Sequence, residues 1–114
     1  MLKITEEFEG GDYLIVSVEG LKEFKYGNEL SSLLKQYAEK VNKALIIDLD
    51  KVTFIHSMFI NSLVVTRNLL HEKGIELWLF NVNDAVSQVL TVTNIDKIVK
   101  VLPDRKALDK QINS

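Results

Sequence analysis

The stretch ALIIDLDKVTFIHS, residues 44–57, decides the fold of this chain. Its first six residues, Ala44–Leu49, form a nearly continuous apolar run, which is typical of a strand buried on both faces. Such a strand lies in the middle of a sheet that has helices above and below it. We therefore expect a central strand here, extended by residues 52–55 and ending in a turn at His56 and Ser57.

Apolar residues at helical spacing predict a helix on each side of this strand. Before it, residues 28–40 form an amphipathic helix, for which Asn28 is the expected N-cap. After it, residues 57–73 form a strongly apolar helix that Gly74 ends in the left-handed conformation. A helix this apolar is either well buried or displays apolar surface to a partner.

The rest of the chain continues the alternation of strands and helices. Residues 10–12, Gly-Gly-Asp, separate two β-rich segments, which predicts an antiparallel hairpin. The later expected elements are a strand at 75–80, a helix at 84–92 capped by Asn83, a strand at 98–102 and a helix from Pro103 onward. The order ββαβαβαβα requires crossovers between parallel strands. We therefore expect one α/β domain over residues 1–114, with a mixed, mostly parallel sheet and helices packed on it.

Composition excludes several classes of protein. A length of 114 residues suits one domain, and a net charge of -2 gives no long-range attraction to nucleic acid or an anionic membrane. The absence of cysteine excludes disulfides and thiolate metal sites, and it fits a reducing cytoplasm. No apolar run approaches the roughly 18–20 residues of a membrane span, and the N-terminus lacks the apolar region of a signal peptide. We expect a cytoplasmic protein without a membrane span.

Patterns that indicate catalysis are missing from the sequence. There is no glycine-rich phosphate loop, and His56 and His71 are about 20 Å apart along the expected helix, too far to share a metal. Asp48 and Asp50 are more simply interpreted as a polar strand end than as paired catalytic carboxylates. A hydrolase that uses His56 and Ser57 lacks a third, orienting group. We expect no enzyme, no metal and no cofactor.

Ser57 is the most informative polar residue, because it lies where a buried strand turns into a buried helix. One interpretation is a simple N-cap. The other adds a switch, since a helix N-terminus offers free N–H groups and the positive end of the dipole to a phosphate. Phosphorylation adds about -1.5 to -2 charges, here beside the apolar Met58, Phe59 and Ile60. Partners that bind by burying an apolar patch would then be lost.

The stretch 45–57 resembles the central strand and turn of the STAS domain (sulfate transporter and anti-sigma factor antagonist). The resemblance continues through Gly74, Leu77 and Asn81. Residues 86–98, VSQVLTVTNIDKI, look like the V..VL..TGLD.I segment of that family, and the order of the elements matches from end to end. The resemblance implies a STAS-like fold for the whole chain.

The resemblance also implies a non-enzymatic bacterial regulator. Stand-alone STAS proteins are commonly anti-sigma factor antagonists in partner-switching pathways. When unphosphorylated, they bind an anti-sigma factor, which is an ATP-dependent serine kinase, and so free the sigma factor that controls transcription. The kinase ends this interaction by phosphorylating a Ser or Thr before the second helix, and a PP2C-type phosphatase resets it. In this chain that phosphoacceptor corresponds to Ser57.

The family's functional motif is altered in this chain. Where the family usually has D-S-S-G-L-G, residues 56–61 read HSMFIN, and an earlier Gly-x-Leu-Asp loop becomes Gly20–Glu23. The resemblance implies partner contacts at the start of the second helix and in the loop before the first helix. The expected contact residues are His56, Met58, Phe59, Asn61, Ser62, Lys22, Glu23 and Phe24.

A second interpretation stays open, because the Ser57–Met58 pair also resembles the Thr-Met turn of stressosome scaffold STAS domains. In that case the protein is a scaffold or transporter-associated subunit. Ser57 is then only a helix cap, and Phe59 anchors a permanent partner.

Overall fold

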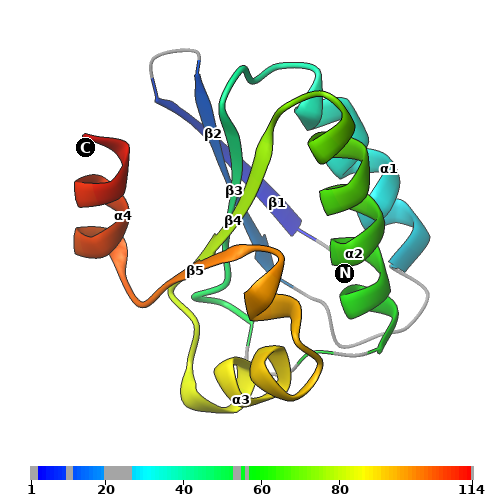
Figure 1. Ribbon diagram of the computed structural model, residues 1–114, viewed down its shortest axis with the longest axis vertical. Coiled ribbons are helices and arrows are strands. Elements are labelled where there is room, and N and C mark those ends of the chain that lie inside the picture. The colour runs from blue at the N-terminus through cyan, green and yellow to red at the C-terminus, as the bar shows by residue number, and fades with distance from the viewer. Residues whose placement is uncertain (1–2, 10–11, 20–26, 53–54, 56, 114) are drawn as a thin grey trace.

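The structure is a computed structural model that describes residues 3–9, 12–19, 27–52, 55 and 57–113. Its described strands form one sheet in the order β1-β2-β3-β4-β5, shown in Figure 1. These strands are β1 (Lys3–Glu9), β2 (Tyr13–Glu19), β3 (Ala44–Asp48), β4 (Glu76–Phe80) and β5 (Lys100–Leu102). β1 pairs antiparallel with β2, and the other neighbouring pairs are parallel. The expected mixed, mostly parallel sheet is confirmed.

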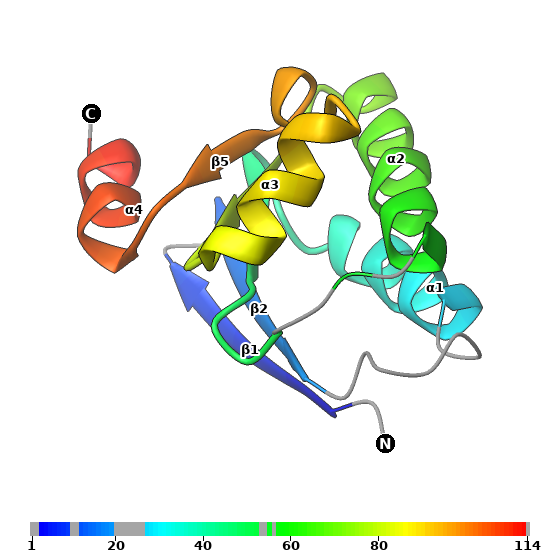
Figure 2. The same ribbon diagram turned by 90° about the horizontal axis from the view of Figure 1, so that it is seen from below.

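The helices cover the two faces of the sheet unequally. They are α1 (Gly27–Ala38), α2 (Ser57–Glu72), α3 (Asp84–Val92) and α4 (Arg105–Ile112), with a short 3-10 helix, η2 (Ile95–Lys97), before β5. Figures 1 and 2 show α1, α2 and α3 on one side of the sheet and α4 on the other. The predicted order of strands and helices is therefore confirmed, with η2 as an addition.

The central strand β3 supplies both hydrophobic cores, which explains its continuous apolar run. Leu45 and Ile47 belong to the larger core beneath α1, α2 and α3. Ala44 and Ile46 belong to the smaller core, where Leu108 of α4 packs over the sheet. Successive side chains of a strand point to opposite faces, so a strand covered on both sides needs an apolar residue at every position.

Two helix ends follow from local sequence as expected. Gly74 has φ +75°, and the N–H of Ile75 donates to the carbonyl of Leu70 at 2.9 Å, a bond that closes the Schellman motif. At the start of α3, the side-chain oxygen of Asn83 accepts from the N–H of Val86 at 2.8 Å, as an N-cap does. These two signals confirm where α2 ends and α3 begins.

Several predicted boundaries were wrong. β3 ends at Asp48, not at residue 55, because the chain turns there: the N–H of Val52 donates to the carbonyl of Leu49 at 2.9 Å. α1 begins at Gly27, which puts Asn28 inside the first turn instead of at the N-cap. β5 begins only at Lys100, because the preceding residues form η2 and a turn.

Candidate partner-binding site

Asp48 connects three neighbouring strands at their carboxyl ends. Its Oδ2 accepts from the hydroxyl of Ser17 on β2 at 3.1 Å, and its Oδ1 accepts from Nδ2 of Asn81, just after β4, at 3.0 Å. The backbone N–H of Asp50 also donates to Oδ1, at 2.9 Å. The Asp48 carboxylate is therefore occupied by neighbouring donors, which agrees with the interpretation of a polar strand end.

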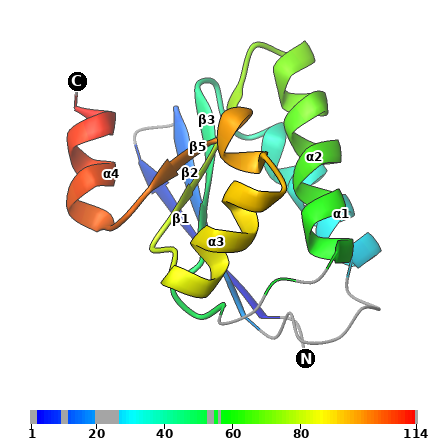
Figure 3. The ribbon, with the colours of Figure 1, turned by 60° about the horizontal axis from the view of Figure 1, so that its bottom comes forward.

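The segment between β3 and α2 is held to the start of α3. Nδ2 of Asn83 donates to the carbonyl of Val52 at 3.2 Å, while Oδ1 of the same side chain caps α3. Residues 53, 54 and 56 lie outside the described part of the chain. Figure 3 shows that α3 lies near the end of the molecule at which α2 begins. Asn83 thus fixes one point of the segment that precedes Ser57.

Ser57 is the first residue of α2, and its side chain is exposed. The first turn of α2 holds no acidic residue, so the positive end of the helix dipole is not offset there by a carboxylate. α2 begins at Ser57, and because position 56 lies outside the described residues, the interpretation of Ser57 as a helix cap stays a prediction.

Two of the expected partner contacts have buried side chains in the structure. Phe59 is 3% exposed and Ser62 is 2% exposed, because both lie on the face of α2 that packs into the molecule. These two side chains offer almost no surface to a partner, and Phe59 is not available as the exposed anchor of a scaffold. Among the α2 side chains that the structure describes, the exposed ones are Ser57, Asn61, Val65, Asn68, His71 and Glu72.

The remaining expected contacts are not described structurally. His56 and the loop residues Lys22, Glu23 and Phe24 lie outside the described residues, and the side chain of Met58 is not described. Of the expected contact set, Asn61 is therefore the residue whose side chain the structure places on the surface.

Two further observations concern metals and membranes. Among the described residues, no group of three or more His, Asp or Glu side chains is arranged to hold a metal ion. No helix within the same residues is long and apolar enough to cross a membrane.

Comparison with known proteins identifies the family. The family model for the STAS domain matches residues 3–108 of this chain. The chain belongs to the STAS domain family. The match covers every strand, the helices α1 to α3 and the first half of α4.

Solved structures of anti-sigma factor antagonists have the same fold. An anti-sigma factor antagonist from Mycobacterium paratuberculosis is 22% identical, with a TM-score of 0.82 over 100% of this chain and 96% of that one. A candidate anti-sigma factor antagonist from Thermotoga maritima is 18% identical, with a TM-score of 0.80 over 97% and 95%. The antagonist SpoIIAA in its unphosphorylated form is 11% identical, with a TM-score of 0.78 over 98% of this chain and 98% of that one. The phosphorylated form of SpoIIAA from Bacillus is also 11% identical, with a TM-score of 0.71 over 95% of this chain and 98% of that one. At these identities the comparison shows the fold.

The sequence analysis did not predict that the side chain of Asn81 bonds to Asp48 or that the side chain of Asn83 bonds to Val52. Asn81 has φ 59°, a left-handed conformation that Asn tolerates better than most residues. Polar residues at the ends of two neighbouring parallel strands, Asp48 as the last residue of β3 and Asn81 directly after β4, were the available signal. The carboxyl ends of parallel strands share one edge of the sheet, where such side chains meet.

Proposed function

We propose that this STAS domain is a non-enzymatic, cytoplasmic anti-sigma factor antagonist that binds an anti-sigma factor serine kinase in a partner-switching pathway. Ser57 is the phosphoacceptor, and a PP2C-type phosphatase removes the phosphate. The observation that supports this most directly is the position of Ser57, exposed at the first residue of α2 in a turn without acidic residues.

The position of Ser57 suits a switch that leaves the fold intact. An exposed hydroxyl is accessible to a kinase active site, and a phosphate at a helix N-terminus is stabilised by the free N–H groups and the dipole. The core residues of α2 lie on its other face. A phosphate on Ser57 therefore changes the charge of the surface without entering the core.

The proposed contact surface leaves out Phe59 and Ser62, which the sequence analysis had included and which are buried. It consists of the exposed face of α2 near its start, with Ser57, Asn61 and Val65. His56, Met58 and the loop residues 22–24 remain proposed contacts. This surface has a polar residue at 61 and an apolar one at 65, which is 38% exposed. A docked kinase would bury Val65. A phosphate on Ser57, at the start of α2, would oppose that docking.

The first experiment tests phosphate transfer. An anti-sigma factor kinase from the same genome is incubated with ATP and the STAS domain, and the phosphorylated residue is mapped by mass spectrometry. We expect phosphate on Ser57 and none on the Ser57→Ala variant. Ser32, which is exposed on α1, provides a matched control, because Ser32→Ala should accept phosphate as the natural protein does.

The second experiment tests the switch by measuring the Kd for the kinase by calorimetry. Ser57→Asp should weaken binding at least tenfold, whereas Ser57→Ala should bind like the natural protein. A kinase that adds no phosphate and binds Ser57→Asp unchanged contradicts the proposal. If Ser57→Ala and Ser57→Asp both assemble normally with a permanent partner, the scaffold or transporter-associated role is the better description.

A further inference from the structure

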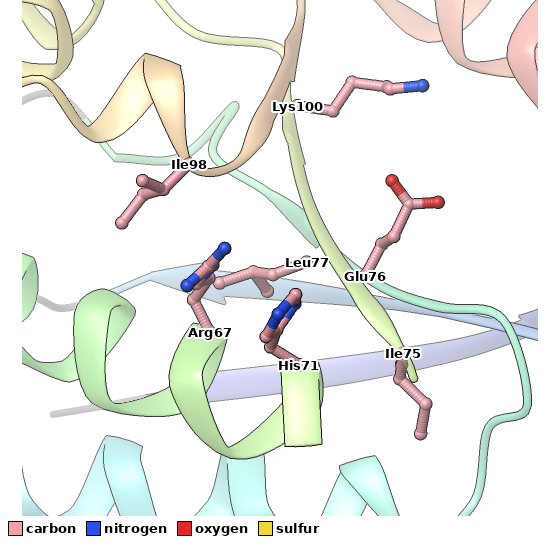
Figure 4. Close-up of a pocket in the computed structure, with 7 residues that line it drawn as sticks. All are labelled: Arg67, His71, Ile75, Glu76, Leu77, Ile98 and Lys100. Atoms are coloured by element: carbon pink, nitrogen blue, oxygen red, sulfur yellow. The ribbon is translucent and has the colours of Figure 1, made fainter. Parts of the chain in front are cut away.

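A partly open cleft lies near the far end of α2 from Ser57. It lies between the last two turns of α2, the beginning of β4 and the turn that precedes β5, and it has a volume of about 260 Å³ (Figure 4). Arg67 and His71 come from α2, Ile75 and Leu77 from the β4 side, and Ile98 from the turn. Ser57 and His71 are about 21 Å apart along the helix, so this cleft is separate from the proposed kinase-binding surface.

Two nitrogen-rich side chains enter this cleft from the same helix face. Arg67 and His71 are four residues apart, and Figure 4 shows their guanidinium and imidazole groups side by side and directed into the space below Ile98. Nη1 of Arg67 donates to the side-chain oxygen of Asn68 at 3.2 Å, which is a neutral acceptor. Within the described residues, no carboxylate forms an ion pair with Arg67. The half-buried guanidinium therefore keeps donors available to an anion.

Two charged residues, Glu76 and Lys100, line the other side of the cleft. In Figure 4 the side chains of Glu76 and Lys100 point away from Arg67 and His71. Nζ of Lys100 lies 5.2 Å from the centre of the Trp78 ring, in the core beneath α4. Glu76 and Lys100 also line the cleft, but the cationic group directed into the space below Ile98 is the Arg67 guanidinium, with the imidazole of His71 beside it (Figure 4).

The opposite wall is apolar and ends at an open sheet edge. Leu77 is buried and Ile98 is 39% exposed, so Ile98 has apolar surface left to cover. Pairing of β4 with β5 starts only at Trp78 and Lys100. The N–H of Glu76 donates to the carbonyl of Lys43 on the β3 side. Successive N–H groups of a strand point to opposite edges, so the N–H of Leu77 points toward the cleft.

We propose that this cleft binds a short-chain carboxylate, with the carboxylate group on Arg67 and His71 and the hydrocarbon chain on Leu77 and Ile98. The planar guanidinium matches a carboxylate in a bidentate pair. The volume is just below the range of about 300–1,000 Å³ for pockets that hold drug-sized ligands, which favours a molecule of a few carbon atoms. A single guanidinium with an apolar wall suits a monoanion better than a phosphate dianion.

The test is a titration of the 15N-labelled protein with sodium butyrate, followed by NMR. We expect saturable shifts of the Leu77 and Ile98 amides, weaker binding of acetate, and no binding of n-butylamine at equal ionic strength. Arg67→Gln should raise the Kd for butyrate about tenfold. The chain's other arginine supplies the matched control, since Arg105 forms an exposed ion pair with Asp109 on α4. Arg105→Gln should leave the Kd unchanged.

A second variant separates the apolar wall from the charge. Ile98→Ser keeps Arg67 and His71, so it should weaken butyrate binding and leave acetate binding unchanged. The proposal is overturned if butyrate gives no saturable shift over the millimolar range, if Arg67→Gln binds it as tightly as the natural protein, or if inorganic phosphate binds as well as butyrate. The measurement needs no kinase, so its outcome is independent of the proposed function.

Discussion

Asn83 is joined to Val52 across two loops: its side-chain amide donates to the Val52 carbonyl at 3.2 Å. The oxygen of the same amide accepts from the N–H of Val86 at 2.8 Å and so caps α3. One side chain therefore serves a local structure and a tertiary one. The tertiary bond holds the segment that leads to Ser57, the residue on which the proposed switch depends.

Asn83→Asp separates these two roles. The carboxylate still caps α3, because Asp and Asn are equivalent N-caps, but it has no donor for the Val52 carbonyl. We expect the free energy of unfolding in urea to fall by about 1 kcal/mol. We also expect faster hydrogen exchange at the Val52 amide, whose bond to the Leu49 carbonyl closes the turn.

Asp104 supplies the matched control for this change. It caps α4 by accepting from the N–H of Ala107 at 2.9 Å, and the structure gives its side chain no second bond of the Asn83 kind within the described residues. Asp104→Asn should therefore change the free energy of unfolding by less than about 0.5 kcal/mol. Equal effects of Asn83→Asp and Asp104→Asn would show that the bond to Val52 contributes nothing.

The carboxylate of Asp48 is expected to matter as an acceptor more than as a charge. Asp48→Ala leaves the donors of Ser17, Asn81 and Asp50 without their partner, and it should lower the free energy of unfolding by about 2–3 kcal/mol. Asp48→Asn keeps an oxygen for two of these donors, and its amide group donates to the hydroxyl of Ser17, so it should cost less than about 1 kcal/mol. Urea unfolding measures both changes.

Asp50, the exposed neighbour of Asp48, supplies the control for the variants Asp48→Ala and Asp48→Asn. Its side chain is on the surface, so Asp50→Ala should change the free energy of unfolding by less than about 0.5 kcal/mol. If Asp48→Asn proves as damaging as Asp48→Ala, the negative charge and not the acceptor geometry holds the three strands together.

The order of elements was predictable because it depends on short-range patterns. The apolar run Ala44–Ile47 predicts a strand covered on both faces, and both cores do meet there. Gly74 and Asn83 end and begin helices through bonds to residues three to five positions away. Each of these signals lies within a few residues of the structure it specifies.

The site was less predictable because it depends on which face of α2 meets the core. Apolar residues occur almost all round this helix, so their spacing does not separate a buried Phe59 from an exposed Val65. The bonds from Asn81 and Asn83 reach residues more than thirty positions away. The sheet brings these residues together, so the polar residues at the strand ends can be paired only once the order of the strands is known.

Gly74 tests a purely conformational cost. A Cβ added there would meet no atom within 4 Å, but φ is +75°. Gly74→Ala should lower the free energy of unfolding by about 1 kcal/mol, because L residues are strained in this region. Gly74→Asn should cost less, since Asn tolerates the left-handed conformation. A loss above about 3 kcal/mol for Gly74→Ala would indicate a steric clash that this geometry does not contain.

Phe59 and Asn61 should affect partner binding for different reasons. Phe59 is buried, so Phe59→Ala should lower the free energy of unfolding by about 3–5 kcal/mol through the cavity it leaves. Asn61 is exposed, so Asn61→Ala should change stability by less than about 0.5 kcal/mol while weakening binding to the kinase. Unfolding in urea and calorimetric binding, measured on the same preparations, separate the two effects. If Phe59→Ala abolished binding at unchanged stability, Phe59 would be exposed in solution and would rejoin the contact surface; if Asn61→Ala bound normally, the start of α2 would not be the docking face.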